Sequence, residues 1–429
     1  MAEKEKRTLR WLRLDNAAKI YPAARKRNWS NLFRLSVTLR ERVDTDVLRS
    51  ALAVTVKRFP SIAARLRKGA FWYYLEEVES APEISTEYCY PLVFMNKNET
   101  RKCAFRVIVF ENRIAVEFFH SLTDGTGGLI FLKNLTAEYL EQKHGISIPF
   151  EQGIVDRKAS PSKEELEDSF LRCAGPVKAS RRDTDAWRLY GEPTKDGRLN
   201  LTCLSLSVKD ALALAHKYDS TLTVFMSAVM MKALLNLQRK KEPYKKNKKR
   251  IKVLIPVNLR QIFSSKTLRN FAMYTVPQLD PRLGDYSLEE ICKIIKHKMG
   301  AELTEKQMGS VIATNVGDEK NPLLRIVPLP IKNLVMKAVF NSVGERKSCL
   351  TLSNLGKVSL PEIMEDYILR FDFILGVQAS APYNCGIISF GDKMYVNFIR
   401  NIINPELEEQ FFEVLKSEGL SAVAESNSK

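Results

Sequence analysis

The sequence lacks the features that would assign it early to a membrane, secreted or metal-binding class. No apolar run reaches the roughly 18–20 residues that a membrane-spanning helix needs. The N-terminal stretch MAEKEKRTLRWLRLD is charged and lacks the apolar core of about 7–15 residues of a secretory signal. We therefore expect a cytoplasmic protein with no transmembrane segment.

Cysteines and histidines are few and scattered. The seven cysteines show no C-x-x-C spacing, which predicts free thiols and neither a disulfide framework nor a metal site. Only four histidines are present, so few side chains are available for base chemistry near neutral pH. Motifs of the G-x-S-x-G, H-E-x-x-H, G-x-x-x-x-G-K-[ST] and G-x-G-x-x-G types are also missing.

Positive charge is in excess, with a formal net charge of +17. Much of it falls in one stretch, KKEPYKKNKKR, at residues 240–250. A solvated loop explains this stretch, and so does contact with ligand phosphates, an acidic protein or nucleic acid. Because no nucleic-acid-binding motif lies nearby, nucleic acid is the least favoured of these partners.

The length of 429 residues predicts two domains, and the pattern of elements predicts a mixture of helices and strands. In the first half we expect a helix at 44–59, a strand at 71–78, a hairpin at 105–119 and a helix at 129–142. In the second half we expect strands near 201–208 and 253–259, a buried helix after 223, and a final strand pair and helix. Periodicity weakens between them, so the division is 1–175, a linker at 176–200, and 201–429. The last ten residues are expected to be frayed.

The stretch FFHSLTDGTGG at 118–128 ends an apolar strand with a histidine and a glycine-rich turn. His120 is placed to protrude into a cleft, where a neutral imidazole can take a proton from an attacking hydroxyl or amine. The glycines permit a tight turn and a close approach of the backbone. From the spacing alone, a catalytic histidine and a structural histidine both remain open.

Four stretches, in order along the chain, resemble the chloramphenicol acetyltransferase-like superfamily, which includes condensation domains and alcohol acetyltransferases. They are LDNAAKIYPAA with the following helix, the H-x-x-x-D-G core, PVNLRQIF with LRNF, and LTLSNLGKV. The opening and the length look most like bacterial stand-alone alcohol acetyltransferase-like proteins. Phe119 stands where many members have a first histidine, and the D-F-G-W-G motif has only DFILG as a poor counterpart.

The resemblance implies an α/β (α+β) fold of two similar domains, each a mixed sheet flanked by helices, with a channel between them. It implies that His120 is the general base and that Asp124 shapes the turn by pairing with Arg260. Gly125 would leave room for substrate. Ser353 and Asn354 would lie on a loop near the donor channel, with Ser353 as an oxyanion donor or only part of a plain turn.

The expected function is therefore transfer of an acyl group from a thioester donor, acyl-CoA or an acyl carrier protein, to a hydroxyl or amine acceptor. Acyl-CoA would be a co-substrate, and no permanently bound cofactor or metal is expected. The alternative is a catalytically inactive relative that binds an acyl carrier or a lipid. The acceptor, the acyl chain length, the oligomeric state and the role of residues 240–250 are not determined by the sequence.

Overall fold

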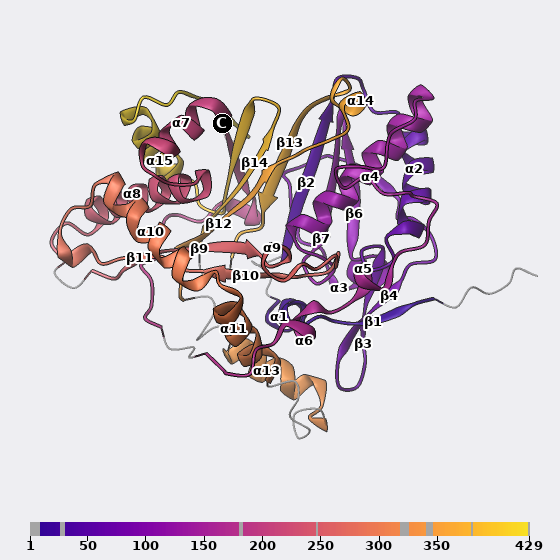
Figure 1. Ribbon diagram of the computed structural model, residues 1–429, viewed down its shortest axis with the longest axis horizontal. Coiled ribbons are helices and arrows are strands. Elements are labelled where there is room, and N and C mark those ends of the chain that lie inside the picture. The colour runs from indigo at the N-terminus through magenta and orange to yellow at the C-terminus, as the bar shows by residue number, and fades with distance from the viewer. Residues whose placement is uncertain are drawn as a thin grey trace, which may run out of the picture.

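The computed structural model describes residues 9–25, 31–179, 183–245, 248–317, 326–339, 346–378 and 381–427. Two large mixed sheets lie in the middle of the molecule, with helices on their outer sides (Figure 1). This confirms the predicted architecture of two α/β units, each with a mixed sheet flanked by helices.

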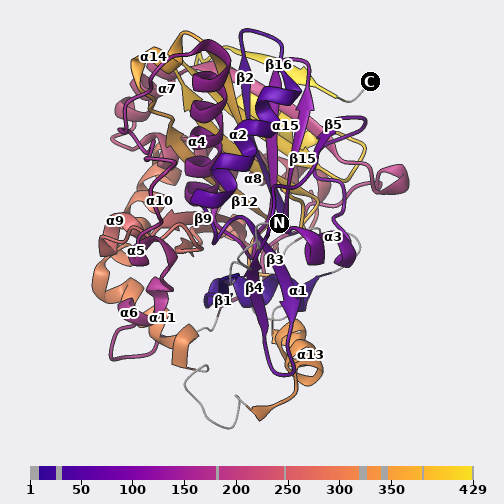
Figure 2. The ribbon, with the colours of Figure 1, turned by 90° about the vertical axis from the view of Figure 1, so that its right-hand side faces the viewer.

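The first sheet has the strand order β13-β2-β7-β6-β5 and is antiparallel except for the parallel pair β5–β6. Helices α2 and α4 cover its outer face (Figures 1 and 2). Helix α2 is capped at its N-terminus, because the Asp44 side chain accepts hydrogen bonds from the amides of Asp46 and Val47. The bounds are β2 Leu32–Leu39, β5 Ile84–Thr86, β6 Phe105–Phe110, β7 Arg113–Phe119, β13 Ile368–Leu375, α2 Thr45–Arg58 and α4 Gly125–His144.

The second sheet has the order β10-β9-β12-β14-β15-β8-β16, and β11 pairs with β9. Helix α8 is buried against it and is covered in turn by α10 and α15, which explains why its sequence is apolar nearly all round. The strand bounds are β8 Asn200–Ser207, β9 Ile251–Asn258, β10 Ala272–Thr275, β11 Gln278–Leu279, β12 Leu350–Lys357, β14 Tyr383–Phe390, β15 Lys393–Arg400 and β16 Ala422–Ser426. The helix bounds are α7 Val208–Lys217, α8 Leu222–Lys241, α10 Leu288–Glu302 and α15 Glu406–Ser417.

A third, small sheet of order β1-β4-β3 lies at one end of the molecule together with α1 and α13 (Figure 2). Its strands are β1 Trp11–Arg13, β3 Ala64–Lys68 and β4 Tyr73–Glu77. The remaining helices are α1 Ile20–Ala24, α3 Lys97–Lys102, α5 Lys163–Leu166, α6 Ser169–Cys173, α9 Arg260–Phe263, α11 Glu305–Gly317, α13 Leu329–Val339 and α14 Glu362–Glu365. Short 3₁₀ turns are found at Ala17–Lys19, Lys195–Gly197 and Pro281–Leu283.

Strand β13 crosses from the second half of the chain into the first sheet, where it pairs with β2 from Ile368 to Leu375. It also contacts β14 of the second sheet, so it joins the two halves. The division at residues 176–200 stays a prediction, but a cut there would leave the first sheet without one of its edge strands.

The predicted fraying of the last ten residues is wrong for β16. This strand pairs antiparallel with β8 over Ala422 to Ser426, because β8 would otherwise present an unpaired edge. The helix predicted at 129–142 begins four residues earlier, at Gly125, because Asp124 caps it. In the described ranges no single helix has the length and hydropathy of a membrane span; α7 and α8 meet that test only together, across a bend of 81°.

Candidate active site

His120 follows the last residue of β7 and is held on three sides. Its backbone amide donates to the carbonyl of Asn31 at 2.9 Å. The Tyr21 ring stacks on the imidazole with 4.4 Å between ring centroids, and the Phe33 ring meets it edge-on at 5.0 Å. These contacts fix the plane of the imidazole while the residue stays partly exposed.

The Nδ1 atom of His120 lies 3.1 Å from Oδ1 of Asn270. The amide group of Asn270 is oriented by Asp15, whose carboxylate accepts from Nδ2 at 3.3 Å. With Nδ2 committed to Asp15, the oxygen of Asn270 faces the histidine and accepts the Nδ1 proton. The lone pair of the neutral imidazole is then on Nε2.

Burial lowers the pKa of His120 below its ordinary value, and this outweighs the nearby charge of Asp124 and the hydrogen bond to Asn270. The imidazole is therefore neutral near pH 7 and able to accept a proton. Burial also raises the pKa of Asp15 to about 6, although the charge of Arg269 acts in the opposite direction. Asp15 is fully buried, and its other oxygen accepts from the amide of Ala18 at 2.7 Å.

Asp124 and Arg260 form the ion pair that the family resemblance implies, with 2.8 Å between Oδ2 and Nη1. The same oxygen accepts from the amide of Phe271 at 2.8 Å, and Oδ1 accepts from the amide of Gly127 at 3.0 Å as the cap of α4. Both side chains are nearly buried.

Arg260 also donates to two carbonyls of the segment after α9, those of Thr267 at 2.7 Å and Arg269 at 2.6 Å. Asn270 lies between Arg269 and Phe271, and both of these neighbours are thus tied to the ion pair. Asp124 and Arg260 therefore position Asn270 as well as the turn that carries His120.

The family resemblance implies that Gly125 leaves room for a substrate. The structure instead shows that neighbouring side chains fill the space beside this residue. A Cβ atom at this position would lie 2.8 Å from a methyl group of Leu355 and 3.4 Å from the Phe373 ring. The missing side chain instead lets β12 and β13 pack closely on the start of α4.

Ser353 and Asn354 lie in strand β12, not on the predicted loop. Ser353 is opposite Gly386 of β14 and is nearly buried, and Asn354 donates to the hydroxyl of Thr223 at 3.1 Å. The segment is a strand because it pairs with β9 and β14 in the middle of the second sheet. The side chain of Leu355, the next residue of β12, lies against Gly125 at the start of α4.

Three residues of the site had no predicted role: Asn270, Asp15 and Tyr21. Their signal was present, since LRNF and LDNAAKIYPAA are two of the stretches that carry the family resemblance. Sequence spacing did not connect them with His120, because Asn270 is 150 positions away along the chain.

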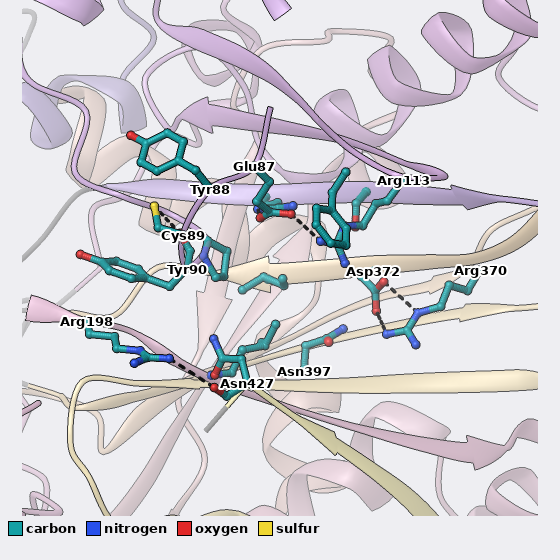
Figure 3. Close-up of a pocket in the computed structure, with 16 residues that line it drawn as sticks. Glu87, Tyr88, Cys89, Tyr90, Arg113, Arg198, Arg370, Asp372, Asn397 and Asn427 are labelled. Atoms are coloured by element: carbon teal, nitrogen blue, oxygen red, sulfur yellow. Dashed lines mark hydrogen bonds and ion pairs between the residues drawn. The ribbon is translucent and has the colours of Figure 1, made fainter. Parts of the chain in front are cut away.

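A cavity of about 670 Å³ lies between the two large sheets (Figure 3). Both sheets line it, for example through Asp372 of β13 and Asn397 of β15. Its walls are strongly charged, and pairs such as Arg370 with Asp372 at 2.7 Å neutralise one another. Neither His120 nor any other predicted site residue lines this cavity. Within the described ranges, no cluster of three His, Cys, Asp or Glu side chains is arranged to hold a metal ion.

No protein-family model matches the chain, and no curated protein sequence matches it. Solved structures do match over nearly its whole length. The trichothecene 15-O-acetyltransferase TRI3 from Fusarium sporotrichioides has a TM-score of 0.61 at 12% identity, covering 95% of this chain and 94% of its own. TRI101 of F. sporotrichioides, solved with coenzyme A and T-2, has a TM-score of 0.60 at 10% identity, covering 97% and 99%.

A condensation domain matches equally well. The starter condensation domain of rhizomide synthetase RzmA, solved with C8-CoA and Leu-SNAC, has a TM-score of 0.60 at 13% identity, covering 95% of this chain and 93% of its own. Acetyltransferases and a condensation domain thus share one architecture with this protein at very low sequence identity. The chain has the fold of these acetyltransferases and of this condensation domain.

Proposed function

We propose that the protein transfers an acyl group from a thioester donor to a hydroxyl or amine acceptor, with His120 as the general base. The observation that carries the proposal is the orientation of His120. Its Nδ1 proton is committed to Asn270, so Nε2 is the atom that is free to take a proton. We also propose that the protein is most similar to the bacterial stand-alone alcohol acetyltransferase-like proteins that its sequence resembles.

In the proposed reaction, Nε2 removes the proton from the acceptor O–H or N–H as that atom bonds to the thioester carbonyl carbon. The tetrahedral intermediate then collapses, the C–S bond breaks, and the imidazolium returns its proton to the leaving sulfur. The products are the acylated acceptor and a free thiol. Holding both substrates in line beside one base gives the rate gain without a covalent acyl-enzyme.

The donor is proposed to be acyl-CoA or an acyl carrier protein. The net charge of +17 favours a phosphate-bearing or acidic donor but does not choose between them. Coenzyme A or an acyl-CoA occupies the solved TRI101 and rhizomide synthetase structures. The basic stretch 240–250 is one candidate contact for such a donor, although residues 246 and 247 lie outside the described residues.

The acceptor group remains a hydroxyl or an amine in this proposal, since Nε2 can take a proton from either. The cavity in Figure 3 lies between the sheets, and residues of both units line it. Ser353 remains a candidate oxyanion donor from β12; a group in that role is worth about 10²–10³ in rate.

The test is thiol release from acetyl-CoA and longer acyl-CoAs in the presence of a mixed pool of alcohols and amines, with intact-mass analysis of the products. His120→Ala should lower turnover by about 10²–10⁴ while the thermal unfolding curve keeps its shape. His216→Ala, at an exposed position of α7, is the matched control and should keep full activity.

Two outcomes would contradict the proposal. Turnover close to that of the unchanged protein in His120→Ala would exclude a base at this position. If no thiol is released with any donor or acceptor, the alternative function is favoured, in which the protein binds an acyl carrier or a lipid without catalysis.

A further inference from the structure

Helix α13 has an apolar face that points to solvent. Ile331, Leu334 and Val335 are 54%, 71% and 55% exposed, and their spacing of three and four residues places them on one side of the helix. An exposed face of this kind on a folded domain marks a contact with a partner or a lipid surface.

The opposite side of α13 is held firmly against the hairpin between β3 and β4. The Lys332 ammonium lies 3.4 Å from the centroid of the Trp72 ring and donates to the carbonyl of Phe71 at 3.1 Å. Asn333 donates to the Tyr73 hydroxyl at 3.0 Å. The orientation of the helix is therefore fixed, and its apolar face is directed outward by these contacts.

The hairpin between β3 and β4 lies next to α13 at the same end of the molecule (Figures 1 and 2), and two further apolar side chains near the helix are exposed. Ile326, just before the helix, is 68% exposed, and Phe71 at the tip of the hairpin is 45% exposed. We call the three exposed apolar side chains of the helix the α13 surface: Ile331, Leu334 and Val335.

Exposed lysines flank this surface. Lys337 lies on α13 beside the apolar stripe, and Lys68 ends β3 next to the hairpin tip. The carboxylate of Glu76, on the neighbouring strand β4, is already paired with Arg65 at 2.6 Å and Arg67 at 2.7 Å. Glu76 is therefore not available to Lys337 or Lys68, and the charge that the described lysines bring to this part of the molecule is positive.

We infer that the α13 surface binds the surface of an anionic lipid bilayer. Aliphatic and aromatic side chains with basic residues at their border match the two layers of such a membrane, the acyl boundary and the negatively charged headgroups. A second copy of the chain is a poorer partner, because its own basic border would face Lys337 and Lys68. The inference is independent of the proposed acyl transfer.

Sedimentation of the whole protein with vesicles tests this inference. Vesicles of phosphatidylcholine with phosphatidylglycerol should bind it, and pure phosphatidylcholine should bind it much less. Leu334→Ser should lower the partition coefficient about tenfold, and Lys337→Gln about fivefold in a salt-sensitive manner.

Leu283→Ser is the matched control, since Leu283 is 79% exposed in the 3₁₀ turn of the second half and should not affect vesicle binding. Equal partitioning of Leu334→Ser and the unchanged protein would overturn the inference. So would a lack of binding to anionic vesicles. Self-association without lipid that Leu334→Ser abolishes would assign the surface to a second copy instead.

Discussion

The ion pair between Asp124 and Arg260 permits a quantitative prediction about stability. The two side chains are 6% and 11% exposed, so each charge is almost removed from water. Removing one partner of a buried pair typically costs about 3–5 kcal/mol, because the other charge is left without compensation. Asp124→Asn keeps an oxygen that can still cap α4, so we expect it to lower the free energy of unfolding by about 3 kcal/mol.

Asp124→Ala should cost about 1 kcal/mol more, because it also removes the hydrogen bond to the amide of Gly127 at the start of α4. Arg260→Met leaves the carboxylate of Asp124 buried and should cost as much as Asp124→Asn. In the double variant both charges are absent, and the loss should be smaller than the sum by about 2–3 kcal/mol.

Urea unfolding followed by circular dichroism measures these free energies in a double-mutant cycle. The control is the cycle for Glu164 and Lys266, which lie 3.2 Å apart at 61% and 76% exposure. Exposed pairs of this kind typically contribute about 0.2–1 kcal/mol. If the coupling of Asp124 with Arg260 is as small as that of the exposed pair, the structural role assigned to both residues is wrong.

Three further predictions concern Asn270, Asp15 and Gly127, which lie around the same turn. Gly300 serves as a distant control. Asn270→Ala should lower kcat about tenfold or more with little change in KM and shift the acid limb of the pH profile, because the imidazole loses the acceptor for its Nδ1 proton. The folded pKa of Asp15, about 6, exceeds its ordinary value of 3.8, so its contribution to stability is full below pH 3.8 and lost as the pH rises through 6. Denaturant titrations of Asp15→Asn and of the unchanged protein measure this effect. The free energy of unfolding of the variant minus that of the unchanged protein should rise by about 3 kcal/mol from acid to neutral pH. A difference that does not change with pH would contradict the raised pKa of Asp15. Gly127→Ala should prevent folding or lower the melting temperature sharply, because its Cβ would overlap the carbonyl of Leu268. Gly300→Ala is the control, because a Cβ at this position of α10 meets open space. It should leave the free energy of unfolding unchanged or raise it by about 0.5–1 kcal/mol.

Local elements could be predicted from the sequence because their signals lie within a few residues. Asp44 before α2 and the capping boxes at Ser162 and Ser287 mark helix starts through hydrogen bonds to nearby amides. The hairpin of β6 and β7 follows from two apolar runs and a short turn. The assignment of Asp124 to a structural pair with Arg260 came from the resemblance of short motifs, and the contact is present.

Other features depend on contacts between distant parts of the chain. The crossing of β13 into the first sheet, and the strand rather than loop at Ser353, result from backbone pairing that leaves no signature in the local sequence. Gly125 was expected to make room for a substrate, but the space is taken by Leu355, more than two hundred positions away.

The sequence by itself singled out His120 as the candidate base, since few histidines exist and this one lies between a strand and a capped helix. It also determined the class of fold, through the order of helices, strands and motifs. Only the tertiary structure decided how the His120 ring is held. Its Nδ1 proton faces Asn270, Asp15 orients that amide, and Tyr21 fixes the ring. Hydrogen-bond geometry of this kind arises when three separate segments fold against one another, and no spacing along the chain specifies it.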